Sequence, residues 1–257
     1  MSGLIQSIFQ NSRKFPKRFN VDLLVVGAGG GGHGGAGHCY SGYGGDAGRG
    51  GTVSTATRVL FSDFTYTATI PGQTEFAQGG YCGYGDVGPN GGTATFSQIP
   101  GISGILPLEL QALSAAGGAG GAFVSGGVSG AGLTTSTAGY SGNGVSSSIA
   151  GVSGTFGGGG TGGGKSTYFG NATIGVGANG GNPGRAGGGG SGSGSAGAGM
   201  NFGSTGGRGA AGCVIMRIKS DTFTTSNTTG ATASTATVNS IVYSIFTWNT
   251  SGTLEII

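Results

Sequence analysis

The stretch VDLLVVGAGGGG, residues 21–32, joins a short apolar run to a run of glycines, and this junction decides the fold. Residues 21–26 are Val and Leu apart from Asp22, and this pattern predicts a buried β-strand. Residues 27–32 match G-x-G-x-x-G, the fingerprint of dinucleotide-binding folds. In those folds the third glycine opens a helix whose N-terminus holds the pyrophosphate of the cofactor.

No helix is expected after this fingerprint. The residues that follow, HGGAGHCYSG at 33–42, contain several glycines, and each costs a helix about 1 kcal/mol relative to alanine. No alternation of strands and helices follows downstream, as a dinucleotide fold requires. We therefore expect no cofactor, and we interpret the glycines as a structural element.

The composition indicates what that element is. Glycine accounts for 66 of 257 residues, and only 7% of the chain is charged. Because glycine loses more conformational entropy on folding than other residues, such a chain is either disordered or packed backbone against backbone. Hydrophobic residues make up 35%, with 13 Phe and 8 Tyr, which argues against disorder. No collagen-like period is present, so we predict polyproline-II-like tracts that hydrogen-bond side by side.

Strands are predicted at both ends of the chain and in its first third, and glycine dominates between them. The predicted strands are residues 21–26, 52–70, 93–99, 213–218, 241–247 and 253–257, with turn signals at 71–72 and 249–252. Residues 100–114 are the only segment with helical character, and a Thr/Ser/Ala-rich connection is expected between residues 218 and 241. The predicted fold class is all-β with little or no helix, a β-strand clamp or sandwich around packed glycine-rich tracts. The strand Val21–Val26 is expected near Val214–Ile218.

This pattern divides the chain into four parts. Residues 1–20 form an N-terminal arm, and 21–116 hold strands with the first glycine tracts. Residues 117–212 form a glycine-rich body, and 213–257 supply the C-terminal strands.

Charge and hydropathy exclude several classes of partner. The net charge of +3 is too small to indicate nucleic acid. No segment approaches the roughly 18 apolar residues of a membrane span, and residues 1–20 lack the charge-then-apolar order of a secretory signal. We expect a soluble protein without membrane insertion, and we interpret the basic cluster at residues 13–18 as a solvated or partner-facing patch rather than a phosphate-binding arm.

No catalytic residues are expected. The segment GVSGA at 127–131 resembles a nucleophile elbow but lacks its last glycine and a following helix, and the eight acidic residues are scattered. A metal site is the weaker of two interpretations for His33, His38, Cys39 and Cys82. Their spacing matches no standard zinc motif, and the alternative is that they fill the ends of glycine tracts. With three cysteines, at least one is free or bonded to another chain.

Aromatic residues interrupt the glycine tracts and have two interpretations. They either cap the array and shield it from water, or they project from exposed turns and stack on sugar rings or apolar receptor surface. The residues concerned are Tyr40, Tyr43, Tyr81, Tyr84, Tyr140, Tyr168, Phe169 and Phe202.

Taken in order, five segments give the chain a resemblance to glycine-rich bacteriophage tail-fibre and tail-appendage proteins, which are adhesin-like. These segments are VDLLVVGAGGGG (21–32), FTYTATIPG (64–72), NGGTATF (90–96), GRGAAGCVIMRI (207–218) and VYSIFTWNTSGTLEII (242–257). The resemblance covers roughly residues 21–257. It implies a virion protein, assembled in the host cytoplasm and exposed on the particle, commonly as a homotrimer.

The resemblance also implies host attachment, by contact of the glycine tracts and loops with a surface glycan or outer-membrane protein. The family's receptor loops have no fixed motif, so no binding residues can be transferred from the family to this chain. The host-surface candidates are therefore the eight aromatic residues above. Only about twenty residues precede the resembling unit, so direct docking onto another tail or capsid protein is expected. The candidate anchoring residues are Ile5, Phe9, Arg13, Lys14, Phe15, Arg18 and Phe19. The alternative, a secreted glycine-rich structural or ice-binding protein, predicts a signal peptide, regular G-x-x repeats and paired cysteines, which this sequence lacks.

Overall fold

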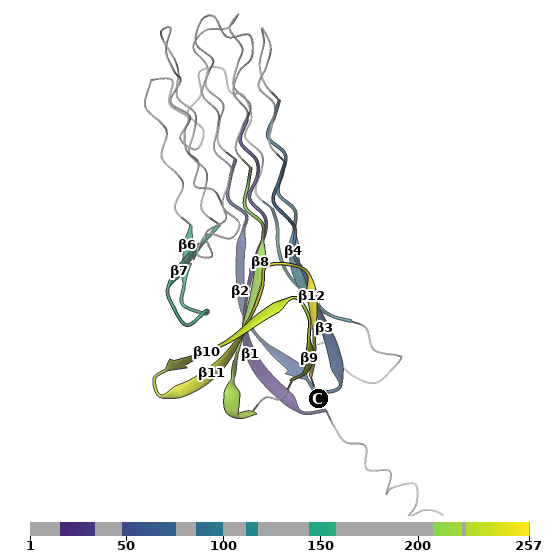
Figure 1. The fold of residues 1–257 in the computed structure, drawn as a ribbon, viewed down its shortest axis with the longest axis vertical. Helices are drawn as coiled ribbons and strands as arrows, with labels where there is room; N and C mark the ends of the chain where they lie inside the picture. The colour runs from purple at the N-terminus through teal and green to yellow at the C-terminus, as the bar shows by residue number, and fades with distance from the viewer. Residues whose placement is uncertain are drawn as a thin grey trace, which may run out of the picture.

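The protein is an antiparallel β-sandwich from which glycine tracts extend in one direction (Figure 1). The computed structural model describes residues 16–33, 48–75, 86–99, 112–117, 144–157, 208–222 and 225–256. Within these ranges nearly all regular structure is β-strand, and one 3₁₀ turn, Ser220–Thr222, is present. The predicted all-β class is therefore confirmed.

Two five-stranded sheets form the sandwich. The first sheet has the order β10-β11-β8-β1-β2 and the second has the order β5-β4-β3-β12-β9. The first sheet contains β1 (Arg18–Val26), β2 (Val53–Phe61), β8 (Cys213–Lys219), β10 (Ala231–Val238) and β11 (Ile241–Trp248). The second contains β3 (Phe64–Thr69), β4 (Ala94–Gln98), β5 (Leu113–Ala115), β9 (Thr225–Thr228) and β12 (Gly252–Ile256). A separate hairpin joins β6 (Val145–Ser147) to β7 (Gly154–Phe156).

The main hydrophobic core lies between the two sheets. In β1 the alternate residues Phe19, Val21, Leu23 and Val25 point into it. Aromatic side chains fill its centre: the rings of Tyr66 and Phe96 stack at 6.0 Å, and Phe96 lies 5.9 Å from Trp248. The other members are Leu60, Ala68, Ala94, Ala115, Val214, Met216, Ile218, Phe246, Leu254 and Ile256. Burial of these side chains at about 25 cal/mol per Å² of apolar area is the main stabilisation of the sandwich.

A second apolar cluster covers the opposite face of β1. Leu24 and Val26 point away from the sandwich core and pack with Ile149 and Phe156 from the region of the β6–β7 hairpin. The cluster is completed by Cys213, Ile215 and Ile245. From Leu23 to Val26 β1 is buried on both faces and every side chain is apolar, whereas in its first half polar residues alternate with buried ones.

The strand predicted from the opening stretch has its predicted neighbour. β1 pairs antiparallel with β8, with Val21 opposite Ile218 and Val25 opposite Val214. The predicted strands at 93–99, 241–247 and 253–257 are also confirmed, with boundaries shifted by at most one residue. Residues 52–70 form two strands, because Asp63 adopts a left-handed conformation, φ 64°, and turns the chain between β2 and β3.

Two expectations about local structure were wrong. Leu113 and Ser114, placed in the segment with helical character, lie in β5, where pairing with β4 and burial of the neighbouring Ala115 favour a strand. The Thr/Ser/Ala-rich connection between residues 218 and 241 contains β9 and β10, because both find a pairing partner in a sheet. Strands β6 and β7 were also missed within the glycine-rich body.

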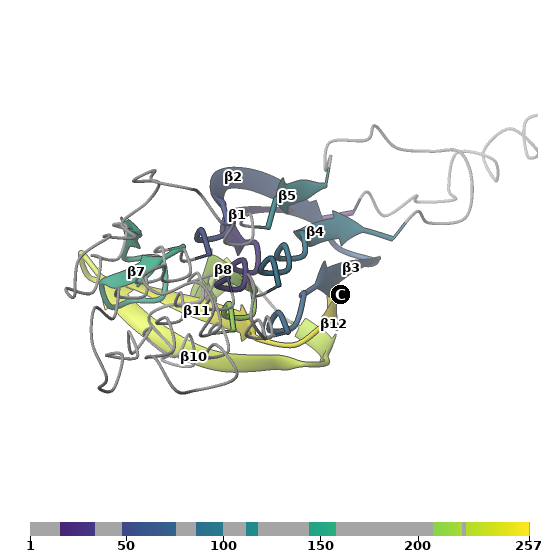
Figure 2. The ribbon, with the colours of Figure 1, turned by 90° about the horizontal axis from the view of Figure 1, so that it is seen from above.

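The glycine tracts are continuations of the strands. Tracts 27–33 and 71–75 and the short segment 116–117 follow β1, β3 and β5, whereas 48–52, 86–92 and 208–212 lead into β2, β4 and β8. Since neighbouring strands are antiparallel, all six tracts leave the sandwich at the same end, as Figure 1 shows. Figure 2, a view from above, shows that they form a bundle rather than a flat sheet.

Tract 27–33 lies at the centre of this bundle and donates hydrogen bonds to three neighbours in turn. Its donors pair as follows: Gly27 N with Thr52 O, Ala28 N with Gly92 O, Gly29 N with Ala210 O, Gly30 N with Arg49 O and Gly31 N with Pro89 O, at 2.8–3.1 Å. Residues three apart therefore bond to the same neighbour. This period matches the three residues per turn of polyproline II, and side-by-side packing by hydrogen bonds is confirmed for the described tracts. Most of the predicted glycine-rich body, residues 118–143 and 158–207, lies outside the described residues.

Candidate functional site

At the last described residues of the glycine tracts, which we call the far end of the described array, exposed charges lie on separate tracts. Arg49, Glu75, Asp86 and Arg208 are exposed at the ends of tracts 48–52, 71–75, 86–92 and 208–212. Arg208 Nη2 lies 3.2 Å from Glu75 Oε2, so two of these tracts are joined by an ion pair. Because both side chains are largely exposed, this pair adds little stability on its own.

Backbone bonds next to that ion pair hold the same two tracts together. Thr74 N donates to Gly209 O at 3.2 Å, and Gly209 N donates to the Thr74 hydroxyl at 2.7 Å. Thr74 is buried, and its hydroxyl accepts the hydrogen bond that Gly209 N cannot make to water. Tracts 71–75 and 208–212 are therefore held together at this level of the array.

The structure places one of the four metal candidates. His33 ends the described part of the central tract and is 2% exposed, so it occupies the interior of the array. His38, Cys39 and Cys82 lie outside the described residues. Among the residues described, no three His, Cys, Asp or Glu side chains come together as metal ligands would.

The eight aromatic candidates for host contact all lie outside the described residues, but their places along the chain are informative. Tyr40 and Tyr43 fall between residues 33 and 48, and Tyr81 and Tyr84 fall between 75 and 86. Each of these intervals begins and ends at the far end of the array. The other four candidates are Tyr140, Tyr168, Phe169 and Phe202.

The opposite end of the molecule receives the N-terminal segment. Lys17 and Ser62 exchange two hydrogen bonds there, Lys17 N to Ser62 Oγ at 3.0 Å and Ser62 N to Lys17 O at 2.9 Å. Arg18 is exposed in β1, with its guanidinium 5.4 Å from the centre of the Phe61 ring. Phe19 is buried in the sandwich core, so its side chain stabilises this protein's own fold. The other anchoring candidates, Ile5, Phe9, Arg13, Lys14 and Phe15, lie outside the described residues.

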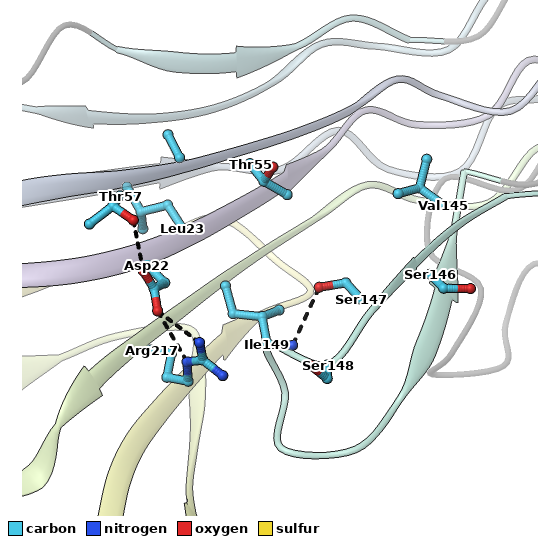
Figure 3. Close-up of a pocket in the computed structure, with 11 residues that line it drawn as sticks. Asp22, Leu23, Thr55, Thr57, Val145, Ser146, Ser147, Ser148, Ile149 and Arg217 are labelled. Carbon is cyan, nitrogen blue, oxygen red and sulfur yellow. Dashed lines mark hydrogen bonds and ion pairs between the residues drawn. The ribbon is translucent and has the colours of Figure 1, made fainter. Parts of the chain in front are cut away.

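A polar groove of about 530 Å³ lies on the outer face of the first sheet (Figure 3). Strands β1, β2 and β8 form its floor, and the segment 145–149 forms its wall. It is lined by Asp22, Leu23, Thr55, Ala56, Thr57, Val145, Ser146, Ser147, Ser148, Ile149 and Arg217.

Asp22 is the centre of a hydrogen-bonded group in this groove. Its Oδ2 accepts from Arg217 Nη2 at 2.8 Å and from Nε at 3.3 Å, and its Oδ1 accepts from the Thr57 hydroxyl at 2.9 Å. The Arg217 guanidinium also lies 5.0 Å from the centre of the Tyr243 ring. The groove thus offers hydroxyl groups and a neutralised ion pair, which suit a hydrogen-bonding ligand without net charge.

The groove contains no catalytic constellation. Its serines, Ser146, Ser147 and Ser148, line it without a histidine, and Asp22 is the one carboxylate among the lining residues. A serine nucleophile needs an adjacent base to be activated, and the Asp22 carboxylate is bonded to Arg217 and Thr57 rather than to a serine. Sequence reasoning missed this groove, although Asp22 signalled it as the charged residue inside an otherwise apolar strand.

Two buried groups have strongly shifted acidity. Burial raises the pKa of Cys213 to about 12, and burial raises the pKa of Tyr66 to about 12 as well. The Tyr66 hydroxyl accepts from Phe61 N at 2.7 Å and donates to Phe61 O at 3.2 Å. Cys213 is a free thiol inside the cluster beneath the β6–β7 hairpin, where it remains protonated at neutral pH. Both groups are therefore structural.

Within the residues described, no helix has the length and apolar character needed to cross a membrane. Searches of curated proteins and of solved structures found no match to this chain. Comparison with protein families matched residues 11–219 to the family described as a glycine-rich domain. The match includes β1, the central tract and the return of the chain into β8. This chain therefore belongs to the glycine-rich domain family.

Proposed function

We propose that the protein is a structural component of a bacteriophage particle, a tail fibre or a tail or capsid appendage. Its N-terminal segment docks onto another virion protein, and the far end of its glycine array contacts the host cell surface. The contacted molecule is a surface glycan or an outer-membrane protein. The order of sequence segments described above is the basis for assigning the protein to a phage particle.

The observation that carries this proposal is the polarity of the fold. β1 begins with Arg18 at the end where the N-terminal segment enters, and it continues through Val26 into the central tract. The other five tracts leave the sandwich in the same direction. A molecule whose entering segment lies at one end and whose glycine tracts leave at the other is suited to hold a recognition surface away from a particle.

The physical chemistry of the array supports a display role. A loop loses less entropy on binding when its ends are already held in place. The hydrogen bonds between tracts, and the Arg208–Glu75 pair, hold the ends of successive chain intervals close to one another. Tyrosine side chains in these intervals supply large amphipathic area with few rotatable bonds.

Docking is tested by deletion of residues 1–15, which leaves β1 and the Lys17–Ser62 bonds intact. Phage lacking the native gene are complemented with wild-type or truncated chain, and the protein in purified virions is quantified. We expect the truncated chain to be lost from virions while it remains folded by circular dichroism. Normal occupancy by the truncated chain would remove the docking role.

Host contact is tested with the purified full chain and host cells. We expect cell binding that falls when Tyr40, Tyr43, Tyr81 and Tyr84 are changed together to alanine. Tyr243→Phe is the matched control, because Tyr243 lies on the sandwich beside Arg217. Absence of binding by the wild-type chain, or equal binding by the quadruple variant, would reduce the array to a scaffold.

A further inference from the structure

We propose that the outer edge of β10 is an interface with a second copy of this chain. In this interface two β10 strands pair antiparallel about a two-fold axis. The two first sheets then become one continuous sheet of ten strands. This inference goes beyond the proposed attachment function, and it concerns the last strand of the first sheet, which β11 and β8 separate from β1.

The first observation is that β10 ends the first sheet with a long, exposed edge. All eight of its residues pair with β11, and the part of the chain described places no strand on its other side. Thr232, Ala233, Ser234 and Thr235 are exposed. Figure 1 shows the β10–β11 hairpin extending beyond the rest of the sandwich. Such an edge presents a row of backbone donors and acceptors that another strand can satisfy.

The other described edges are protected. The edges formed by β2 and β5 face one another, and Ser54 Oγ donates to Ser114 O across them at 2.8 Å. β9 has four residues, and its pairing with β12 shifts register between Glu255 and Ile256. Short strands and irregular pairing are ordinary devices against edge-to-edge association. The eight residues of β10 pair with β11 in unbroken register.

The sequence of β10 lacks the usual protective residues. ATASTATV, residues 231–238, contains no lysine, no other charged residue, no proline and no glycine. The paired strand β11, IVYSIFTW, is also uncharged. The net charge of +3 is therefore carried elsewhere, and two copies of this hairpin meet without electrostatic repulsion. The absence of charge favours a second copy as the occupant.

Side-chain size and nearby apolar surface support the same occupant. A two-fold axis perpendicular to the sheet places small side chains, Ala, Ser and Thr, opposite one another near its centre, and cross-strand pairs of Thr or Ser are favourable. Ile241 and Val242, at the start of β11, are 38% and 49% exposed. Val152 is 71% exposed and follows Gly151, which packs against Ala236. A second copy seated on β10 lies next to these three apolar residues.

The two-fold symmetry of the proposed interface predicts the molar mass of the assembly. Pairing of an edge with the same edge is isologous and closes at two copies. The β10 interface therefore gives a dimer, whereas the resemblance to tail-fibre proteins implies a trimer. The two assemblies differ in molar mass and can be distinguished in solution.

The test is the molar mass of the full chain, measured by sedimentation equilibrium over a range of concentrations. We expect a wild-type dimer, and Thr235→Lys is expected to weaken it by about tenfold or more because two like charges meet near the axis. Val87→Lys is the matched control: it adds the same charge at a residue that is 65% exposed in tract 86–92, and it leaves the dimer unchanged.

Folding of each variant is checked by the fluorescence of Trp248, the single tryptophan, which is buried in the core. If Thr235→Lys does not fold, Ser234→Lys replaces it on the opposite face of the same strand. A wild-type chain that is monomeric at every concentration would overturn the proposal. So would a trimer, or a dimer that both β10 lysine variants leave intact.

Discussion

At the residue scale, glycine is required in the array at positions where any side chain would overlap a neighbouring backbone. A Cβ on Gly51 would overlap the carbonyl group of Gly27 in the central tract, and one on Gly117 would overlap Gly91. Both contacts are with backbone, which cannot rotate away as a side chain can. The glycine content is therefore set by the distance between tracts, and the conformational entropy it costs is offset by inter-tract hydrogen bonds.

Gly51→Ala and Gly72→Ala test this requirement. We expect Gly51→Ala to lower the free energy of unfolding by about 1–3 kcal/mol, the usual range for overpacking, or to prevent assembly of the array. Gly72→Ala enters open space and is expected to be neutral or to stabilise by about 0.4–1 kcal/mol, since it restricts the unfolded chain. Urea unfolding followed by Trp248 fluorescence measures both. Equal effects of the two variants would contradict the steric explanation.

The buried thiol of Cys213 and the buried hydroxyl of Tyr66 predict how the free energy of unfolding changes at alkaline pH. Cys213 ordinarily ionises near pH 9 and Tyr66 near pH 10, and burial raises the pKa of each to about 12. Below pH 9 both groups are protonated in the folded and the unfolded chain. Above that pH the unfolded chain loses protons that the folded chain keeps, so stability falls as pH rises toward 12.

Cys213→Ala isolates the contribution of the thiol. We expect the loss of stability per pH unit between pH 9 and 12 to be smaller in this variant, by up to about 1.4 kcal/mol per unit. Tyr66→Phe is expected to reduce the same slope from pH 10 upward. Urea unfolding at successive pH values provides the measurement. Slopes identical to that of the wild-type chain would show that neither group is protected in the fold.

At the element scale, β1 and the central tract behave as one continuous unit. β1 hydrogen-bonds to β2 and β8, and the tract that follows it bonds to the segments that lead into β2, β4 and β8. The apolar run and the glycine run of the opening stretch thus perform related tasks. The first packs through side chains on both faces, and the second packs through backbone in three directions.

At the scale of the whole molecule, this continuity predicts cooperative unfolding. The central tract cannot keep its hydrogen bonds to neighbouring tracts if β1 unfolds. This is because each neighbouring tract is held in position by the strand that it leads into. We expect thermal transitions followed by Trp248 fluorescence and by the polyproline-II signal in circular dichroism to coincide. The first reports the sandwich and the second reports the array. Loss of the polyproline-II signal at a clearly lower temperature would show that the array is a separate folding unit.

Much of the fold was predictable from local sequence, whereas the sites were not. The apolar runs 21–26 and 213–218 predicted buried strands and their proximity, since each is too apolar to lie at a surface. β10 could not be predicted, because its small polar residues acquire a strand conformation only through pairing with β11. The groove at Asp22 likewise depends on Arg217 and the segment 145–149, which are remote in sequence and meet through sheet order.

The sequence by itself determined that the fold is all-β and that the glycines of the described segments form packed tracts. These properties depend on local periodicity and on the conformational cost of glycine. Both are set by residues that are adjacent in sequence. Only the tertiary structure decided which tract lies at the centre of the described bundle, which strand ends the first sheet and which polar groups share a groove. Those properties depend on contacts between residues far apart in sequence, and such contacts are set by the pairing order of the strands.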